Sequence, residues 1–357
     1  MCNNHRNPIR CIIPPYIADK MMDSKKITTA VSLDNQLRNH RFRSDRKFFS
    51  ALSRPNQKIM AVKQVKVAKP KPVIEVHTCA RGYSLPGKLI SPKLLASSKD
   101  KDEKNVYQGA KYTWEFYNKI FNRNSLDNKG MALINSVHYG KKYDNAMWNG
   151  RQMVYGDGDK ITFGSFTLDL DVIGHELTHG VTQFTANLDY ENQSGALNES
   201  FSDVFGIMIK QFALNQDVNE SNWLIGENVM IGKQYALRSM KAPGTAYKNH
   251  PQWGDDPQPA TMDNYQNLPN TDDGDYGGVH YNSGIPNYAF CMAALEVGGY
   301  AWEKVGKVWY AALTQVLQNN ANFAAAKSAT IDRARELFGK GSNVEKAVAN
   351  GWNKAKV

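Results

Sequence analysis

The chain has 357 residues, of which 41% are hydrophobic and 22% are charged, and this composition excludes a disordered, fibrous or low-complexity protein. The length suffices for about two domains with a substantial core. The net charge of +10 lies mostly in the first sixty residues, which carry 12 Lys and Arg against 4 Asp, so the remainder does not indicate a nucleic-acid-binding surface.

Membrane insertion and disulfide stabilisation are also excluded. No apolar run approaches the ~18–20 residues that would cross a bilayer, and the first residues lack the apolar stretch of a secretory signal. Four cysteines are too few and too scattered for a disulfide framework, so we expect free thiols at Cys2, Cys11, Cys79 and Cys291. A metal site at Cys2, His5 and Cys11 would have a spacing unlike the standard zinc motifs.

The first fifty residues are predicted to form a segment of their own. They contain a proline-marked stretch, Ile12-Ile13-Pro14-Pro15-Tyr16-Ile17, followed by polar and basic residues up to Ser50. Adjacent prolines favour an extended backbone that has no N–H groups to donate. Residues 51–72, which end in Lys69-Pro70-Lys71-Pro72, have the composition of a linker.

The remainder changes from a β-rich half to a helical half. Short β-rich runs occur at 73–76 and 131–137, and one helix with an apolar face is expected over 106–121. From about residue 171 the pattern favours helices over 171–185, 197–213, 287–297, 302–317 and 322–337. This order predicts an α+β fold with two lobes.

The strongest chemical motif is His175-Glu176-Leu177-Thr178-His179. On an α-helix the two histidines lie one turn apart on one face, so both imidazoles can bind one zinc ion. A catalytic zinc needs a third protein ligand and an open position for water, and Glu176 is placed to take the proton of that water. The motif therefore predicts a hydrolytic zinc site if a third ligand exists.

Glu199 supplies that third ligand in the predicted arrangement. It lies 20 residues after His179, which leaves room for a turn and a second helix packed antiparallel to the first. Asp203 follows four residues later on the same helix face and can accept the outer N–H of a zinc-bound imidazole. Read without the upstream histidines, the Asn198-Glu199-Ser200 run would be a helix cap.

These residues resemble the thermolysin family of zinc endopeptidases, the gluzincins. The resemblance rests on four motifs in the family's order and covers most of residues 73–350. They are the helix motif at 175–179, the segments Asn198-Glu199-Ser200-Phe201-Ser202-Asp203 and Gly277-Gly278-Val279-His280-Tyr281-Asn282-Ser283, and the strand Asn145-Ala146-Met147-Trp148-Asn149-Gly150. A zinc helix on the floor of a cleft between two lobes is what the resemblance implies.

The resemblance also assigns roles at the reacting centre. It implies one zinc ion held by His175, His179 and Glu199, with Glu176 as general base. It implies that His280 and Tyr190 stabilise the oxyanion and that Asp275 orients His280, while Asp203 and Asn198 support the ligands. For substrate binding it implies backbone contacts from Asn145, Ala146 and Arg238, and an apolar pocket lined by Phe163, Phe166, Val172 and Leu237. A large apolar residue is then expected after the scissile bond, in a pocket that Phe166 reshapes.

One departure from the family concerns calcium. Classical members bind two calcium ions with carboxylates near the zinc helix. Here Asp171 and Glu227 are kept, but Lys210, Asn222 and Leu224 stand where those members have acids. The double site is expected to be lost. Either the Lys210 ammonium lies between Asp171 and Glu227 in place of the missing positive charge, or Lys210 is a surface residue.

A second departure is the short N-terminal segment, which resembles the prosegment of the protealysin-like subgroup. This resemblance implies that residues 1–50 cover the cleft through Pro14, Pro15 and Tyr16 and inhibit the enzyme. Self-removal is expected near Phe49-Ser50-Ala51. The alternative is that these residues form a disordered basic tail.

The sequence therefore predicts a self-processing zinc endopeptidase that cleaves before large apolar residues. Its organisation would be a prosegment at 1–50, a linker at 51–72, a β-rich lobe at 73–190 and a helical lobe at 191–357. Peptides and its own prosegment are the expected partners of a monomer, without nucleic acid or membrane. We expect a cytosolic precursor with non-classical release. The alternatives are another HExxH hydrolase or a catalytically silent zinc-binding protein.

Overall fold

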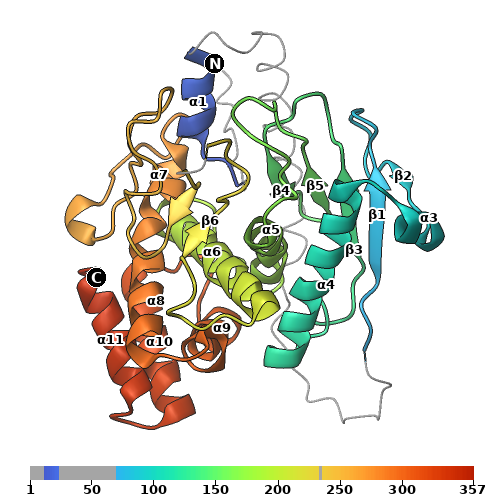
Figure 1. Cartoon of the computed structure of the whole chain (residues 1–357). Helices are drawn as coiled ribbons and strands as arrows, with labels where there is room; N and C mark the ends of the chain where they lie inside the picture. Colours follow the sequence, from blue (N-terminus) through green and yellow to red (C-terminus); the bar gives the residue numbers. More distant parts are fainter. Residues whose placement is uncertain (1–11, 24–69, 233–234) are drawn as a thin grey trace, which may run out of the picture.

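The computed structural model describes residues 12–23, 70–232 and 235–357, which form two lobes flanking a pair of central helices (Figure 1). The expected processing region at Phe49-Ser50-Ala51, the linker up to residue 69 and the Cys2–His5–Cys11 group lie outside these residues. Cys79 and Cys291 are buried free thiols, as expected. The α+β prediction with a sheet-containing first lobe and a helical second lobe is confirmed.

The first lobe is built on a five-stranded sheet with strand order β2-β1-β3-β5-β4. Its strands are β1 (Ile74–Thr78), β2 (Lys88–Leu89), β3 (Leu133–Val137), β4 (Ala146–Trp148) and β5 (Met153–Tyr155). The central strands β1, β3 and β5 run parallel, and the outer strands β2 and β4 pair antiparallel to them. Strand β4 therefore forms the edge of the sheet that faces the second lobe (Figure 1).

Helix α4 (Lys101–Phe121) packs against this sheet, after the short helix α3 (Pro92–Ser97). The predicted helix began at 106, whereas the observed helix begins five residues earlier. Asp100 caps it by accepting from the backbone N–H groups of Asp102 (2.8 Å) and Glu103 (3.2 Å). The polar first turn lacks the apolar face that marks the rest of the helix, so periodicity could not find it.

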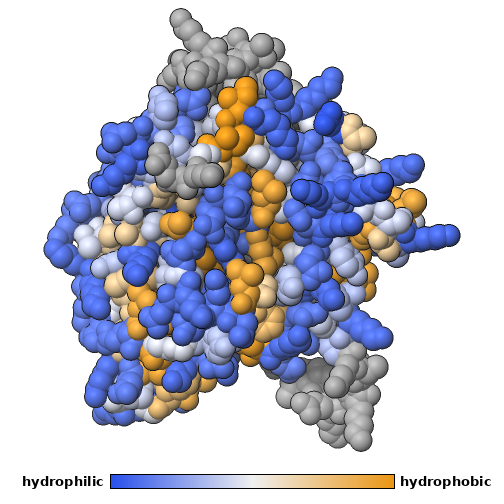
Figure 2. All heavy atoms as spheres, in the orientation of Figure 1, coloured by the Kyte–Doolittle hydropathy of each residue, from blue (hydrophilic) through white to orange (hydrophobic). Residues whose placement is uncertain are grey.

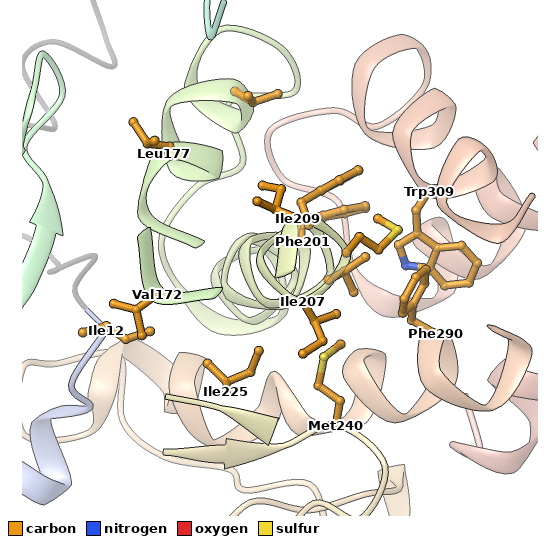
Figure 3. Close-up of a cluster of buried hydrophobic side chains, with 14 of the residues drawn as sticks. Ile12, Val172, Leu177, Phe201, Ile207, Ile209, Ile225, Met240, Phe290 and Trp309 are labelled. Atoms are coloured by element: carbon orange, nitrogen blue, oxygen red, sulfur yellow. The ribbon is translucent and has the colours of Figure 1, made fainter. Parts of the chain in front are cut away.

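The second lobe is helical. It contains α7 (Asp275–Asn282), α8 (Gly284–Val297), α9 (Val305–Gln315), α10 (Phe323–Phe338) and α11 (Asn343–Lys354), with the short pair β6 (Leu224–Ile225) and β7 (Arg238–Ser239). There are also two 3₁₀ turns, of which Met262–Asn264 lies between β7 and α7, and Ala301–Glu303 lies between α8 and α9. Figure 3 shows part of its core, in which Phe290 of α8 and Trp309 of α9 lie on one side of α6 with their ring centroids 5.2 Å apart.

Two central helices, α5 (Leu170–Gln183) and α6 (Asn192–Leu214), join the lobes. Every residue of α5 from Asp171 onward is buried, so the helix is enclosed on all sides. The two helices approach closely at glycines, because a Cβ on Gly174 would lie 3.2 Å from the Gly206 Cα and a Cβ on Gly206 would lie 2.6 Å from the Asp171 carbonyl oxygen. This close contact brings the motif residues of both helices to one point.

A short N-terminal helix, α1 (Pro15–Asp23), lies over the opening between the lobes (Figure 1). The face of the molecule in Figure 2 is mostly hydrophilic, with narrow apolar strips. Among the described residues, no helix is both long enough and apolar enough to cross a bilayer.

Candidate metal and catalytic site

Three buried side chains from α5 and α6 form a compact donor group. The Nε2 atoms of His175 and His179 are 3.1 Å apart. Glu199 places Oε2 3.4 Å from the His175 Nε2 and Oε1 3.4 Å from the His179 Nε2. The two histidines lie one helical turn apart, and Glu199 comes from the antiparallel helix, as the spacing predicts.

The outer nitrogens of both imidazoles are held by α6. The His175 Nδ1 lies 2.8 Å from the Asp203 Oδ1, and the His179 Nδ1 lies 2.9 Å from both the Asn198 Oδ1 and the Ser202 Oγ. These contacts turn both Nε2 atoms toward Glu199. Two imidazole nitrogens and one carboxylate oxygen are the donor set of a catalytic zinc site, so the residues fit this metal. Ser202 was not singled out from the sequence, although it lies four residues after Asn198 on the same helix.

Asp203 also anchors Arg238, the first residue of β7. Its two carboxylate oxygens accept from the Arg238 Nε and Nη2 at 2.8 Å each, and the Asn287 Nδ2 donates a further hydrogen bond at 2.9 Å. Burial opposes ionisation of Asp203, but Arg238 and His175 outweigh it and lower the pKa of this carboxyl to about 2. A buried carboxylate therefore links a metal-ligand candidate to the arginine that faces the cleft. Asn287 was not predicted as part of this site.

Glu176 projects from α5 toward the edge strand of the first lobe. Its Oε2 accepts a hydrogen bond of 2.7 Å from the backbone N–H of Trp148 in β4, and the side chain is fully buried. The carboxylate of the predicted base is thereby fixed between the donor group on α5 and the strand expected to bind substrate. The sequence motif gave no indication of the contact with Trp148.

Tyr190 and His280 form the opposite wall of the site. The Tyr190 hydroxyl donates to the Glu199 Oε1 (2.5 Å) and lies 3.2 Å from the His280 Nε2. Asp275 binds His280 twice, at its backbone N–H (2.7 Å) and at Nδ1 (2.6 Å). Burial favours the neutral ring, but the carboxylates of Asp275 and Glu199 outweigh it and raise the pKa of His280.

A left-handed turn delivers Asp275 and His280 to these positions. Residues 275–278 all have positive φ, with values from 51° to 84°, immediately before the right-handed part of α7. Gly277 is required there, because a Cβ would lie 2.3 Å from the Asn192 Oδ1. Asp275 and Tyr276 adopt this backbone without being glycine, at a cost of ~1–2 kcal/mol each.

The N-terminal segment occupies the cleft next to these groups. The Ile12 N–H donates to the Ala146 carbonyl (3.3 Å), the Ile13 N–H donates to the Asn145 Oδ1 (3.3 Å), and the Arg238 Nη1 donates to the Ile12 carbonyl (3.0 Å). Ile12 is fully buried and its side chain lies beside Val172 (Figure 3).

We expected Pro14, Pro15 and Tyr16 to cover the cleft, but the residues that form its hydrogen bonds lie just before them in the chain. Ile12 and Ile13 make the cleft contacts, and Pro15 begins helix α1. The reason is chemical, because Asn145 and Ala146 accept backbone N–H groups, which proline lacks. The tail alternative is wrong for the described part of the segment, since Ile12, Ile13, Tyr16 and Ile17 are buried.

The residues predicted to line the apolar pocket lie in the core, and one of them, Val172, lies beside Ile12 (Figure 3). Phe163, Phe166, Val172 and Leu237 are all fully buried and belong to the same core cluster as Ile12. The Phe163 and Phe166 rings pack with centroids 5.6 Å apart. Phe166 therefore belongs to the same buried apolar group as Phe163.

Lys210 lies between Asp171 and Glu227, and the surface alternative is wrong. Its Nζ is 2.9 Å from the Asp171 Oδ2 and 2.7 Å from the Glu227 Oε1, with only 13% of the side chain exposed. Burial disfavours the ammonium, but Asp171 and Glu227 outweigh it and raise the pKa of Lys210. Asn222 donates to the other Glu227 oxygen (2.7 Å), and Leu224 lies in β6.

Comparison with known proteins gives matches over nearly the whole chain. The family model "Thermolysin metallopeptidase, catalytic domain" matches residues 63–183, and "Thermolysin metallopeptidase, alpha-helical domain" matches residues 186–357. Protease PrtS of Photorhabdus sp. (strain Az29) is 46% identical over 280 residues, which are 78% of this chain and 74% of that protein. An extracellular metalloprotease of Pectobacterium carotovorum subsp. carotovorum is 41% identical over 93% of this chain and 92% of its own.

A solved structure has the same fold. The precursor of protealysin, a metalloproteinase from Serratia proteamaculans, superimposes with a TM-score of 0.84 at 40% sequence identity. The match covers 98% of this chain and 99% of that one.

Proposed function

Since this chain belongs to the thermolysin metallopeptidase family and is a zinc metalloendopeptidase, we propose that it is made as a precursor inhibited by its own N-terminal segment. The proposal includes cleavage on the N-terminal side of large apolar residues and self-removal of the segment. One observation carries it: Ile12 holds the cleft through a backbone N–H to Ala146 and a backbone carbonyl to Arg238.

This pair of hydrogen bonds supports the proposed specificity. Ile12 is bound as a residue within a chain, by both sides of its backbone, and its side chain is enclosed by apolar groups such as Val172. We take Ile12 to occupy the position of the residue that follows the scissile bond. A substrate with Leu, Ile or Phe at this position would bury a comparable apolar area, worth ~1.5–3 kcal/mol relative to an exposed side chain.

The proposed mechanism gives each side chain one task. His175, His179 and Glu199 would hold zinc, which when bound supplies Lewis-acid chemistry to the scissile carbonyl and the attacking water. Glu176 takes the proton of the water on its carboxylate and passes it to the leaving amine. His280 and Tyr190 donate hydrogen bonds to the oxyanion that develops on the substrate. Removing one such donor typically costs ~10²–10³ in rate.

The proposed inhibition follows from the same contacts. While Ile12 and Ile13 are hydrogen-bonded to Ala146, Asn145 and Arg238, a substrate cannot form the same hydrogen bonds. Self-removal near Phe49-Ser50-Ala51 would free the cleft. We further propose that the mature form is a monomer that acts outside the cell, which the name of the Pectobacterium relative, an extracellular metalloprotease, supports.

Two alternatives were a silent zinc-binding protein and another hydrolase with the same helix motif. The silent protein has no support in a family of proteases whose base, Glu176, is present and held by Trp148. A hydrolase that acts on a chain terminus is less compatible with Ile12, which follows eleven residues of chain.

The test compares the wild type with Glu176→Gln, followed by intact mass and by casein cleavage with and without a zinc chelator. The glutamine keeps an oxygen for the Trp148 N–H but cannot accept the proton. Loss of about fifty residues and chelator-sensitive cleavage in the wild type alone would support the proposal. If a trace of outside protease removes the segment and the wild type is still inactive, the proposed function is wrong.

A further inference from the structure

The N-terminal segment makes a second contact with the enzyme, through the side chain of Tyr16. Tyr16 lies four residues after Ile12 in the first turn of α1 and is 8% exposed. The backbone N–H groups of Ile17 (3.1 Å) and Ala18 (3.3 Å) both donate to the Pro14 carbonyl, so the chain turns into the helix directly after the cleft. This turn carries the Tyr16 ring to residues other than Asn145 and Ala146.

Aromatic and charged side chains surround Tyr16. Its ring lies 4.3 Å from the Tyr281 ring between centroids, at an interplanar angle of 48°. Tyr281 directly follows His280, so the Tyr16 site borders the reacting centre. Burial raises the pKa of Tyr16 well above its ordinary value, and the nearby Tyr247 and Asp256 add to this effect. Tyr16 thus lies in a buried, largely aromatic recess.

The recess belongs to the body of the enzyme and is independently braced. Asp256 accepts from the backbone N–H groups of Gly244 and Ala246 (3.1 Å each) and of Gln258 (3.0 Å). Tyr247 is 1% exposed and packs edge-on against Trp253, with ring centroids 5.8 Å apart. The contacts of Asp256 do not involve α1, so this part of the recess keeps its form when the segment leaves, whereas the Trp253 carbonyl accepts a hydrogen bond of 2.7 Å from Lys20 of α1.

We propose that this recess is a distinct subsite for an aromatic side chain of a bound peptide. The peptides it selects carry a large apolar residue after the scissile position and an aromatic residue four residues later, with a proline turn between them. The inference rests on the proposed function, because it takes Ile12 as the residue that follows the scissile bond. The aromatic ring supplies this contact, since the Tyr16 hydroxyl is buried without a hydrogen-bond partner among the described residues, whereas the ring packs against Tyr281.

The first test uses a synthetic peptide of residues 12–23 as an inhibitor of the mature enzyme. A fluorogenic substrate too short to reach the recess reports activity. Tyr16→Ala in the peptide should raise Ki about tenfold or more, as truncation of a buried aromatic anchor does elsewhere, whereas Tyr16→Phe, which keeps the ring, should leave Ki within about twofold. The Ile12→Ala peptide, which lacks the apolar side chain in the cleft, serves as the comparison for the cleft itself.

The second test changes the enzyme. Tyr281→Ala should bring the Ki of the parent peptide to that of its Tyr16→Ala form, because the Tyr281 ring packs against Tyr16 with centroids 4.3 Å apart. Equal Ki for the parent and the Tyr16→Ala peptide, with weaker binding of the Ile12→Ala peptide, would overturn the subsite and leave the proposed function intact. If no peptide inhibits and the short substrate is not cleaved, the proposed function fails and the subsite with it.

Discussion

Replacement of Lys210 by Met should destabilise the protein, because it leaves two carboxylates without their cation. Asp171 is fully buried, and Glu227 is 30% exposed. Breaking a fully buried ion pair by removing one partner costs ~3–5 kcal/mol. Partial exposure of Glu227 places this case at the lower end, about 3 kcal/mol. For a chain of 357 residues that corresponds to a fall in Tm of roughly 4 °C.

The assay is thermal unfolding followed by circular dichroism in a Glu176→Gln background, which prevents self-digestion. Lys119→Met is the matched control, because Lys119 pairs with Glu115 at 2.8 Å but is 59% exposed. Its loss should cost at most about 1 kcal/mol. Equal shifts for the two variants would refute the argument that Lys210 neutralises a buried site.

The same reasoning predicts how stability responds to calcium. The ammonium of Lys210 supplies the positive charge that calcium provides in classical members, so buffering calcium away at constant zinc should leave the wild-type Tm unchanged. Lys210→Glu should make the Tm rise with added calcium, since it restores an acid beside Asp171 and Glu227. A fall of ten degrees or more in the wild type when calcium alone is removed would contradict this account.

Three further predictions concern other parts of the molecule. The hydrogen bond that the His138 Nδ1–H donates to Asp157 raises the pKa of His138 from 6.5 to about 9, so the stabilising contribution of His138 is full below pH ~6.5 and lost as the pH rises through 9. Urea unfolding should show the wild type losing its advantage over His138→Asn between pH 6 and 9.5; a constant difference would contradict this. Gly277→Ala should lower kcat at least about tenfold with bound zinc unchanged, because its Cβ meets the Asn192 Oδ1; a normal kcat would count against it. Arg238→Lys should lower kcat/KM about 10²-fold through loss of the forked contact, and a change under threefold would argue otherwise.

Helices and metal ligands followed from the sequence because each depends on local periodicity. The spacing of His175 and His179 and the position of Glu199 are fixed by helix geometry once two antiparallel helices are assumed. Helix ends were less accurate, as the capping of α4 by Asp100 illustrates. Helix α11 was not predicted, although Ser342 caps it by accepting from the Glu345 N–H (3.2 Å).

Contacts between distant segments could not be read from spacing. The hydrogen bond of Trp148 to Glu176, the contact of Asn287 with Asp203 and the placement of Ile12 each join residues that no local pattern relates. The prolines were predicted to cover the cleft because they are the rigid part of the N-terminal segment. The cleft instead binds backbone N–H groups, which proline lacks. For this reason Ile12 and Ile13, and not the prolines, form its hydrogen bonds.

The chain of contacts from Ile12 through Arg238 and Asp203 to His175 has a thermodynamic consequence. A bound peptide carbonyl steadies Arg238, Arg238 steadies Asp203, and Asp203 fixes the imidazole that would hold the metal. Linkage is reciprocal, so whatever the bound segment adds to zinc affinity, zinc adds to the affinity for the segment. If the segment inhibits as proposed, the precursor should therefore hold zinc more tightly than the mature enzyme does at equilibrium with a competing chelator, so the segment would protect the cofactor as well as the cleft.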